Sequence, residues 1–134
     1  MYNGLNGKKD VPAAIKWWEK ASMKGASQAM LHLGTHYYNS KQYELSLKWY
    51  EMAGTKNDRT AQYWTGILYS TDGTTFKSMD KAKEWYEKSA KQGYVAAINN
   101  LAYILHNEKT SASQKQAFAW WKEGTNRGSS ISQL

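Results

Sequence analysis

The feature that most constrains this chain is an aromatic pair that recurs four times at nearly constant spacing. Each pair follows a small residue and two variable ones, and a charged and small-residue run comes after it. The first aromatic residues lie 32, 36 and 35 residues apart, and the pairs are Trp17-Trp18, Trp49-Tyr50, Trp85-Tyr86 and Trp120-Trp121. A period of this length indicates an array of supersecondary units that bury their faces by stacking.

A second pattern lies between the aromatic pairs. An Ala, a Leu or Thr, and a Tyr or Leu follow one another at i, i+4 and i+8, which is the spacing of one helical stripe. A Gly or Ala stands next to the middle residue, where it permits a close helix contact. The three stripes are Ala29-Leu33-Tyr37, Ala61-Thr65-Tyr69 and Ala97-Leu101-Leu105, with Gly34, Gly66 and Ala102 beside them. Each unit is therefore predicted to be a pair of helices.

The helix ranges follow from these stripes and from capping residues. The first helices of the units are predicted near 26–39, 59–71 and 94–107, and the second helices near 11–23, 41–54, 79–91 and 114–126. Ser78 and Ser113 are expected before second helices as N-caps. Left-handed C-cap positions are predicted at Gly25, Gly93 and Gly128, with Asp58 near the equivalent place in the second unit.

Together these residues resemble the Sel-one-like repeat, a relative of the tetratricopeptide repeat. The segment from Ala61 to Gly93 is the nearest match to its pattern of Ala-x-x-x-Leu-Gly-x-x-Tyr followed by Lys-Ala-x-x-Trp-Tyr. The resemblance implies an all-α fold, a right-handed α-solenoid of antiparallel helix pairs with about three and a half repeats. It also implies a protein–protein interaction scaffold or adaptor. Members occur in bacterial secretion, signalling and toxin–immunity systems and in eukaryotic quality control.

The units divide residues 1–134 as one repeat domain. We expect a partial repeat over 1–25, repeats over 26–58, 59–93 and 94–128, and the start of a further helix over 129–134. Both ends interrupt a unit, so the chain looks like a fragment of a longer array, or a short form whose ends pair with another copy. Solenoids need polar caps, so self-association through uncapped ends is expected, with Tyr2, Ile131 and Leu134 at the exposed surfaces.

The charge pattern decides between classes of partner. The net charge is +7, so nucleic acid, anionic lipid and acidic protein must each be weighed. The predicted first helices are nearly free of charged residues, and Lys lies beside Glu on the second helices. In the families that the chain resembles, first helices line the concave surface and second helices form the convex back. A nucleic-acid protein would concentrate its basic residues where the backbone lies, so a protein or peptide ligand is favoured; nucleic-acid binding through a basic convex face is the alternative.

The tetratricopeptide pattern implies which residues face the ligand. Counted from the Leu of the Leu-Gly position, the concave face is uncharged, aromatic and rich in amides. The expected partner-binding residues are Tyr2, Asn3, Thr35, Tyr38, Asn39, Tyr63, Ile67, Asn99, Tyr103, His106 and Asn107.

Catalytic, metal and cofactor sites are not expected. His32 and His36 have the i, i+4 spacing of a metal site, but no third ligand is evident. The segment from Gly4 to Lys9 lacks the spacing of a phosphate loop, and the repeat spacing of the aromatic pairs indicates core packing and not base stacking. Trp17, Trp49, Trp85 and Trp120 are therefore expected in the core.

The compartment stays open. The sequence has no cysteine, no apolar run of membrane-spanning length and no basic segment followed by an apolar one at its start. We expect a soluble chain, for which the bacterial cytoplasm, the periplasm and secretion all remain alternatives.

Overall fold

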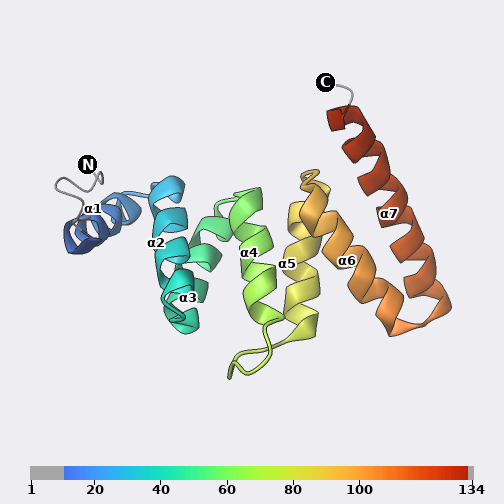
Figure 1. The fold of residues 1–134 in the computed structure, drawn as a ribbon, viewed down its shortest axis with the longest axis horizontal. Helices are drawn as coiled ribbons and strands as arrows, with labels where there is room; N and C mark the ends of the chain where they lie inside the picture. Colours follow the sequence, from blue (N-terminus) through green and yellow to red (C-terminus); the bar gives the residue numbers. More distant parts are fainter. Residues whose placement is uncertain (1–10, 133–134) are drawn as a thin grey trace. The chain divides into compact units, whose positions relative to one another are not determined.

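The structure, a computed structural model, describes the backbone of residues 11–132 and side chains up to residue 128. This part of the chain is all-helical, with seven α-helices that pack in sequential pairs, as Figure 1 shows. Each of the first six helices begins and ends within two residues of its predicted range. The helices fall into two compact units, Met1–Lys56 and Asn57–Leu134. The predicted all-α architecture of helix pairs is confirmed.

The first unit holds α1 (Val11–Met23), α2 (Ser27–Asn39) and α3 (Tyr43–Thr55). Its core is built from the predicted stripe of α2 and the small-plus-aromatic face of α3. Ala29, Met30 and Leu33 of α2 and Tyr50 and Ala53 of α3 are all buried. The connection between α2 and α3 is tight, and Lys41 adopts a positive φ of 62° in it.

The second unit holds α4 (Arg59–Tyr69), α5 (Met79–Lys91), α6 (Val95–Glu108) and α7 (Ser111–Ser132). In Figure 1 these helices lie next to one another in chain order. Its core contains Ala61, Leu68, Ala82, Ile98 and Leu101, none of which is more than 1% exposed. The longer connection between α4 and α5 turns at Gly73, where φ is +86°.

Glycine at the stripe position lets a tyrosine ring lie against the helix backbone. A Cβ added to Gly34 would lie 2.7 Å from the Tyr50 ring, and one added to Gly66 would lie 2.7 Å from the Tyr86 ring. Both tyrosines are 2% exposed. The Gly and the second aromatic residue of the repeat are thus two halves of one contact between the helices of a pair.

The third pair departs from this arrangement because its stripe carries Ala102 and its second aromatic residue is Trp121. Ala102 is fully buried and already has the Cβ that Gly34 and Gly66 lack. Trp121 is 38% exposed and its ring lies 5.4 Å from the ring of His106. Trp18, the second aromatic residue of the first pair, also packs against a histidine: its ring stacks on the His32 ring at 5.1 Å.

Several predicted helix ends are confirmed and three are wrong. Gly25 and Gly93 have φ of +89° and +84°, and the Ser78 side chain accepts a hydrogen bond from the Lys81 N–H. In the second repeat the left-handed residue is Asn57, at φ 71°. Asp58, which the prediction placed near this position, is instead the N-cap of α4, and its side chain accepts from the Ala61 N–H.

The other two wrong predictions both concern α7, which is longer than expected at both ends. It begins at Ser111, so Ser113 lies inside the helix and exchanges hydrogen bonds with Thr110: each side-chain oxygen accepts the other residue's N–H at 3.0 Å. This reciprocal pair has the form of a capping box. At the other end α7 continues through Gly128, because glycine permits a left-handed turn without requiring one.

The four leading tryptophans have different surroundings despite their shared motif. Trp49 and Trp85 are 8% exposed and lie in the core, as predicted, and Trp120 is half-buried. The prediction is wrong for Trp17, which is 67% exposed because no helix of the described residues covers that face of α1.

Candidate partner-binding surfaces

The exposed stripe of α6 is the clearest candidate surface. Ala97, Leu101 and Leu105 bury one side of this helix, and the opposite side therefore points away from the core. Four of the predicted binding residues form this opposite side, and all four are exposed: Asn99, Tyr103, His106 and Asn107. Tyr103, a large side chain near the centre of the helix, is 62% exposed.

His106 connects this stripe to α7. Its Nδ1 lies 2.9 Å from Oε1 of Gln114, whose Nε2 donates to the backbone oxygen of His106. The Trp121 ring lies against the His106 ring as well. The edge of the stripe is therefore held in place by two side chains of the neighbouring helix, and it presents a pre-ordered aromatic and amide surface.

The equivalent residues of α2 are partly engaged within their own unit. The Thr35 hydroxyl hydrogen bonds with the Tyr50 hydroxyl at 2.7 Å, and the Tyr38 ring makes an edge contact with Tyr43 at 5.6 Å. Thr35 and Asn39 are exposed, and Tyr38 is half-buried.

The equivalent residues of α4 are more deeply packed. Tyr63 and Ile67 are half-buried. The Tyr63 ring lies 5.2 Å from the Tyr94 ring and 6.1 Å from the Tyr86 ring, which ties the start of α6 to α4 and α5. Much of the Tyr63 surface is thus used inside the unit. The predicted Tyr2 and Asn3 lie outside the described residues.

The hydroxyl of Tyr50 is the buried titratable group next to the α2 surface. Burial raises its pKa above the usual value of 10.0, the hydrogen bond from Thr35 opposes this shift, and Tyr38 adds to it. The neutral phenol therefore stays the stable form at neutral pH and can take part in the Thr35 hydrogen bond.

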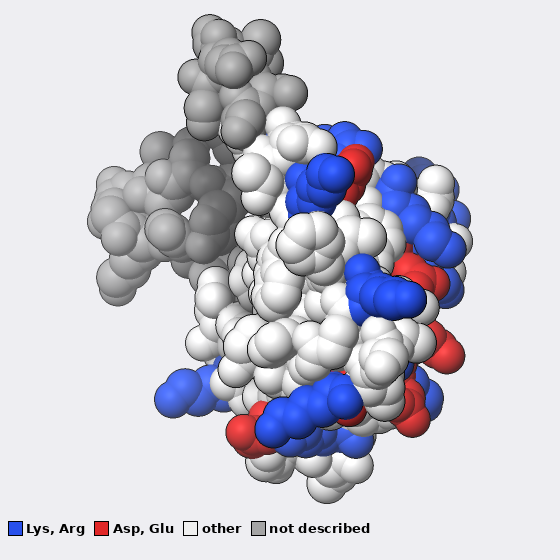
Figure 2. Space-filling view, turned by 90° about the vertical axis from the view of Figure 1, so that its right-hand side faces the viewer, with Lys and Arg blue, Asp and Glu red and all other residues white. Residues whose placement is uncertain are grey.

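Charged residues lie mostly outside these polar stripes. α2 contains no Lys, Arg, Asp or Glu, and α6 contains only Glu108, its last residue. Four basic side chains of the second unit pair with acidic ones, and Figure 2 shows red side chains beside blue ones on the face it presents. The ion pairs are Lys77–Asp72, Lys83–Glu108 at 2.6 Å, Lys91–Glu87 at 3.5 Å and Arg127–Glu123 at 2.8 Å.

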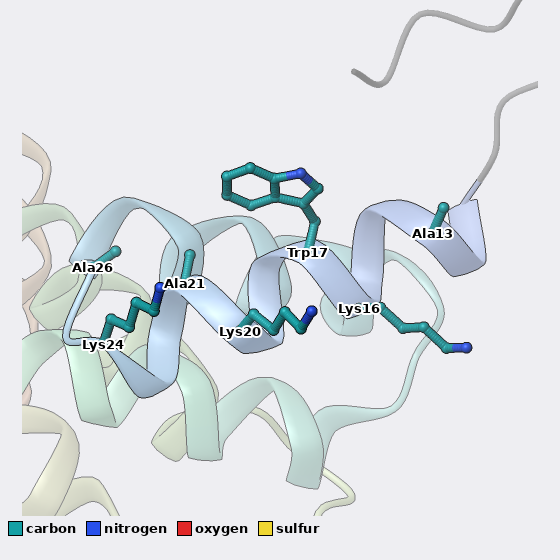
Figure 3. A pocket seen from close by; sticks show the side chains of 7 residues that line it. All are labelled: Ala13, Lys16, Trp17, Lys20, Ala21, Lys24 and Ala26. Carbon is teal, nitrogen blue, oxygen red and sulfur yellow. The ribbon is translucent and has the colours of Figure 1, made fainter.

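A further hollow lies along α1 and was missed by the sequence reasoning. It has a volume of about 670 Å³, and Figure 3 shows the Trp17 ring standing away from the helix beside it. The lining side chains are Ala13, Lys16, Trp17, Lys20, Ala21, Lys24 and Ala26. The signal was present as three lysines one helical turn apart, but the shared motif suggested that Trp17 would be buried.

The i, i+4 spacing of His32 and His36 does not lead to a metal site in residues 11–128. No group of three or more potential metal ligands occurs there. His32 stacks on Trp18 and His36 makes an edge contact with Tyr37, so both rings have ordinary packing roles. Among the described helices, none combines the length and apolar character that crossing a bilayer requires.

Comparison with known proteins agrees with the repeated helix pairs of the structure. The sequence model of the Sel1 repeat matches residues 1–25, 27–58, 59–94 and 95–129. Among solved structures, a Sel1 repeat protein from Oxalobacter formigenes is 27% identical with a TM-score of 0.75, over 96% of this chain and 55% of that one. The protective antigen c5321 of uropathogenic Escherichia coli, which displays an SLR fold, is 25% identical with a TM-score of 0.74, over 85% of this chain and 26% of that one.

Curated relatives are longer proteins. The F-box protein At1g70590 of Arabidopsis thaliana is 30% identical over 70% of this chain, and chitin synthase regulatory factor 4 of Schizosaccharomyces pombe is 29% identical over 71%. The chain spans only 26% and 15% of their respective lengths. The similarity therefore covers only a part of each of these proteins.

Proposed function

Because the chain belongs to the Sel1 repeat family, whose members generally serve as protein-interaction scaffolds, we propose that it binds a partner protein or peptide on the uncharged face of its first helices. Repeat scaffolds of this family are typically non-catalytic. The proposed contact residues are Thr35, Tyr38 and Asn39 of α2 in the first unit, and Asn99, Tyr103, His106 and Asn107 of α6 in the second unit. Tyr63 and Ile67 of α4 contribute less to the contact with the partner, because both side chains are half-buried.

The observation that carries this proposal is the exposed α6 stripe with Tyr103 at its centre. A tyrosine offers a large rigid contact area and loses little conformational entropy on binding. The amides of Asn99 and Asn107 supply donors and acceptors for the backbone of an extended peptide. The lack of charge on this side of the helix favours a ligand that binds by shape and hydrogen bonds.

The test separates the α6 stripe from the charged helices. A partner is recovered by affinity capture and identified, and its Kd is then measured for the wild type and for Tyr103→Ala/Asn107→Ala. We expect a loss of about tenfold or more, because central aromatic contacts carry much of the binding energy of an interface. The matched control is Lys115→Glu/Lys122→Glu on exposed positions of α7, which should leave the Kd within about twofold since rim charges contribute little.

Salt distinguishes the alternative of nucleic-acid binding through the basic face. A phosphate-driven complex would weaken steeply between roughly 50 and 200 mM salt. If the control reversal abolished binding while the α6 double variant retained full affinity, the proposal would be wrong and the basic helices would form the working surface.

A further inference from the structure

The exposed side of α1 combines an open tryptophan ring with a row of lysines. We define the Trp17 face as Ala13, Trp17 and Ala21 together with Lys16, Lys20 and Lys24. The small and aromatic residues form an apolar floor, and the lysines follow one another at i, i+4 and i+8 along one side of the helix (Figure 3). Four residues of an α-helix rise about 6 Å, so the three ammonium groups form a row with roughly that spacing.

Trp17 is the exposed member of a position that is buried in two other repeats. Trp49 and Trp85 are 8% exposed, and a lysine Nζ lies over each ring, 5.0 Å away at Trp49 and 4.3 Å at Trp85. Trp17, at 67% exposed, leaves most of its ring open to contact from another chain. Its neighbours Ala13 and Ala21 carry only methyl groups, so a helix could approach to an interaxial distance of about 8–10 Å with the indole ring between its side chains.

The positive charge of the Trp17 face indicates which kind of segment can bind there. In the described part of the chain, no carboxylate lies within ion-pair distance of Lys16, Lys20 or Lys24. A second copy of this chain would oppose the same three lysines. Residues 1–10 of the chain contain Lys8 and Lys9 against Asp10 alone and offer no net negative charge. Complementarity therefore favours an acidic segment from outside residues 1–134.

We propose that the Trp17 face is a second interaction surface, which binds an acidic amphipathic helix of a partner protein. Carboxylates at every fourth position of such a helix repeat at about the same 6 Å as the lysines. The apolar side of the helix covers Trp17, and its acidic edge lies along Lys16, Lys20 and Lys24. This surface does not depend on the α6 stripe, so either proposal can fail while the other holds.

The probe is a fluorescein-labelled helical peptide of about 16 residues, long enough to hold helical structure. It carries Glu at every fourth position beside a row of Ala and Leu, and the control peptide carries Lys in place of each Glu. Binding to the full chain is measured by fluorescence anisotropy. We expect saturable binding of the Glu peptide and none of the Lys peptide.

The variants assign the binding to this face. Trp17→Ala and Lys16→Glu/Lys20→Glu should each raise the Kd about tenfold or more, since an aromatic anchor and a close charge pair are the contacts that dominate an interface. Lys115→Glu/Lys122→Glu makes the same change of charge on α7 and should stay within about twofold. Because Trp17 is exposed, its replacement should leave the melting temperature nearly unchanged, which separates lost binding from lost folding.

Four results would overturn the proposal. The first is equal affinity for the two peptides, and the second is tighter binding of a single-stranded oligonucleotide or of anionic phospholipid vesicles with the same dependence on Lys16 and Lys20. The third is a wild-type dimer that Lys16→Glu/Lys20→Glu dissociates in sedimentation. The last is tighter peptide binding by Tyr2→Ala/Leu5→Ala, which would show that the apolar side chains of the chain's own first residues compete for the face.

Discussion

Replacement of Gly66 by alanine tests whether the Gly–Tyr contact sets the distance between paired helices. A Cβ at this position would lie 2.7 Å from Cδ1 and Cε1 of Tyr86 and 3.1 Å from its Cγ. Favourable carbon–carbon contacts lie at about 3.5–4.0 Å, so either the ring or α5 has to move. The ring has little room to do so, because Tyr86 is 2% exposed and its hydroxyl lies 3.3 Å from Ser70 Oγ.

Two effects of opposite sign determine the size of the change. Overpacking a core costs about 1–3 kcal/mol, while replacing an interior helical glycine by alanine gains about 1 kcal/mol. The expected net effect of Gly66→Ala is a loss of about 1 kcal/mol, with an upper bound of roughly 2 kcal/mol. Gly128 is the matched control, because it is also helical but has no heavy atom within 4 Å of an added Cβ. Gly128→Ala should therefore stabilise the chain by about 0.5–1 kcal/mol.

The assay is urea unfolding followed by far-ultraviolet circular dichroism, with Tyr86→Ala added to complete a double-mutant cycle. Tyr86→Ala removes the ring that the new methyl group would meet. In that background, Gly66→Ala should be neutral or stabilising. If Gly66→Ala stabilised the wild type as much as Gly128→Ala does, the steric account of the contact would be refuted.

Three further predictions concern stability. Trp85→Ala should cost about 3–5 kcal/mol and Trp17→Ala less than about 1 kcal/mol, because only the first is buried; equal changes in urea midpoint would contradict this. Burial raises the pKa of the Tyr50 hydroxyl, so the folded state holds its proton more tightly, and stability that is present at neutral pH should fall as pH rises above about 10; a Tyr50→Phe variant should lose this part of the alkaline dependence. Asp58→Ala removes the side chain that caps α4 and should cost about 1 kcal/mol, whereas Asp58→Asn should cost less.

Much of the fold was predictable because local chemistry repeats with the sequence. The stripe of Ala61, Thr65 and Tyr69 and the pair Trp85-Tyr86 each define a helix face, and Ser78 carries its own capping group. The structure adds that Gly66 and Tyr86 form one contact, which explains why the glycine and the aromatic residue recur together. Such positions are specified by neighbours within the same repeat.

Positions that depend on another element were predicted less well. Trp17 has the same place in the repeated motif as Trp49, but its burial depends on a covering helix and not on its own residues. Gly128 resembles Gly25, yet it stays helical. Asn57 takes the left-handed turn while the adjacent Asp58 caps the next helix, since both residue types tolerate either role.

The candidate surface was predictable in part. Spacing along α6 placed Tyr103 on the exposed side of the helix, as the structure shows. The same count on α4 selected Tyr63, whose ring packs against Tyr86 and Tyr94. The difference arises because α4 and α6 have different neighbours, which a count along one helix does not include.

Hydrogen–deuterium exchange of the complex is the most direct test of partner binding on the exposed stripe of α6, because it locates the partner on the chain without any substitution. The captured partner is added to the full chain, and the exchange of each helix is compared with that of the free protein. If the partner binds on the α6 stripe, exchange should become slower across Val95–Glu108 and change little across Met79–Lys91. Protection confined to the lysine-bearing Met79–Lys91, with none across Val95–Glu108, would contradict it.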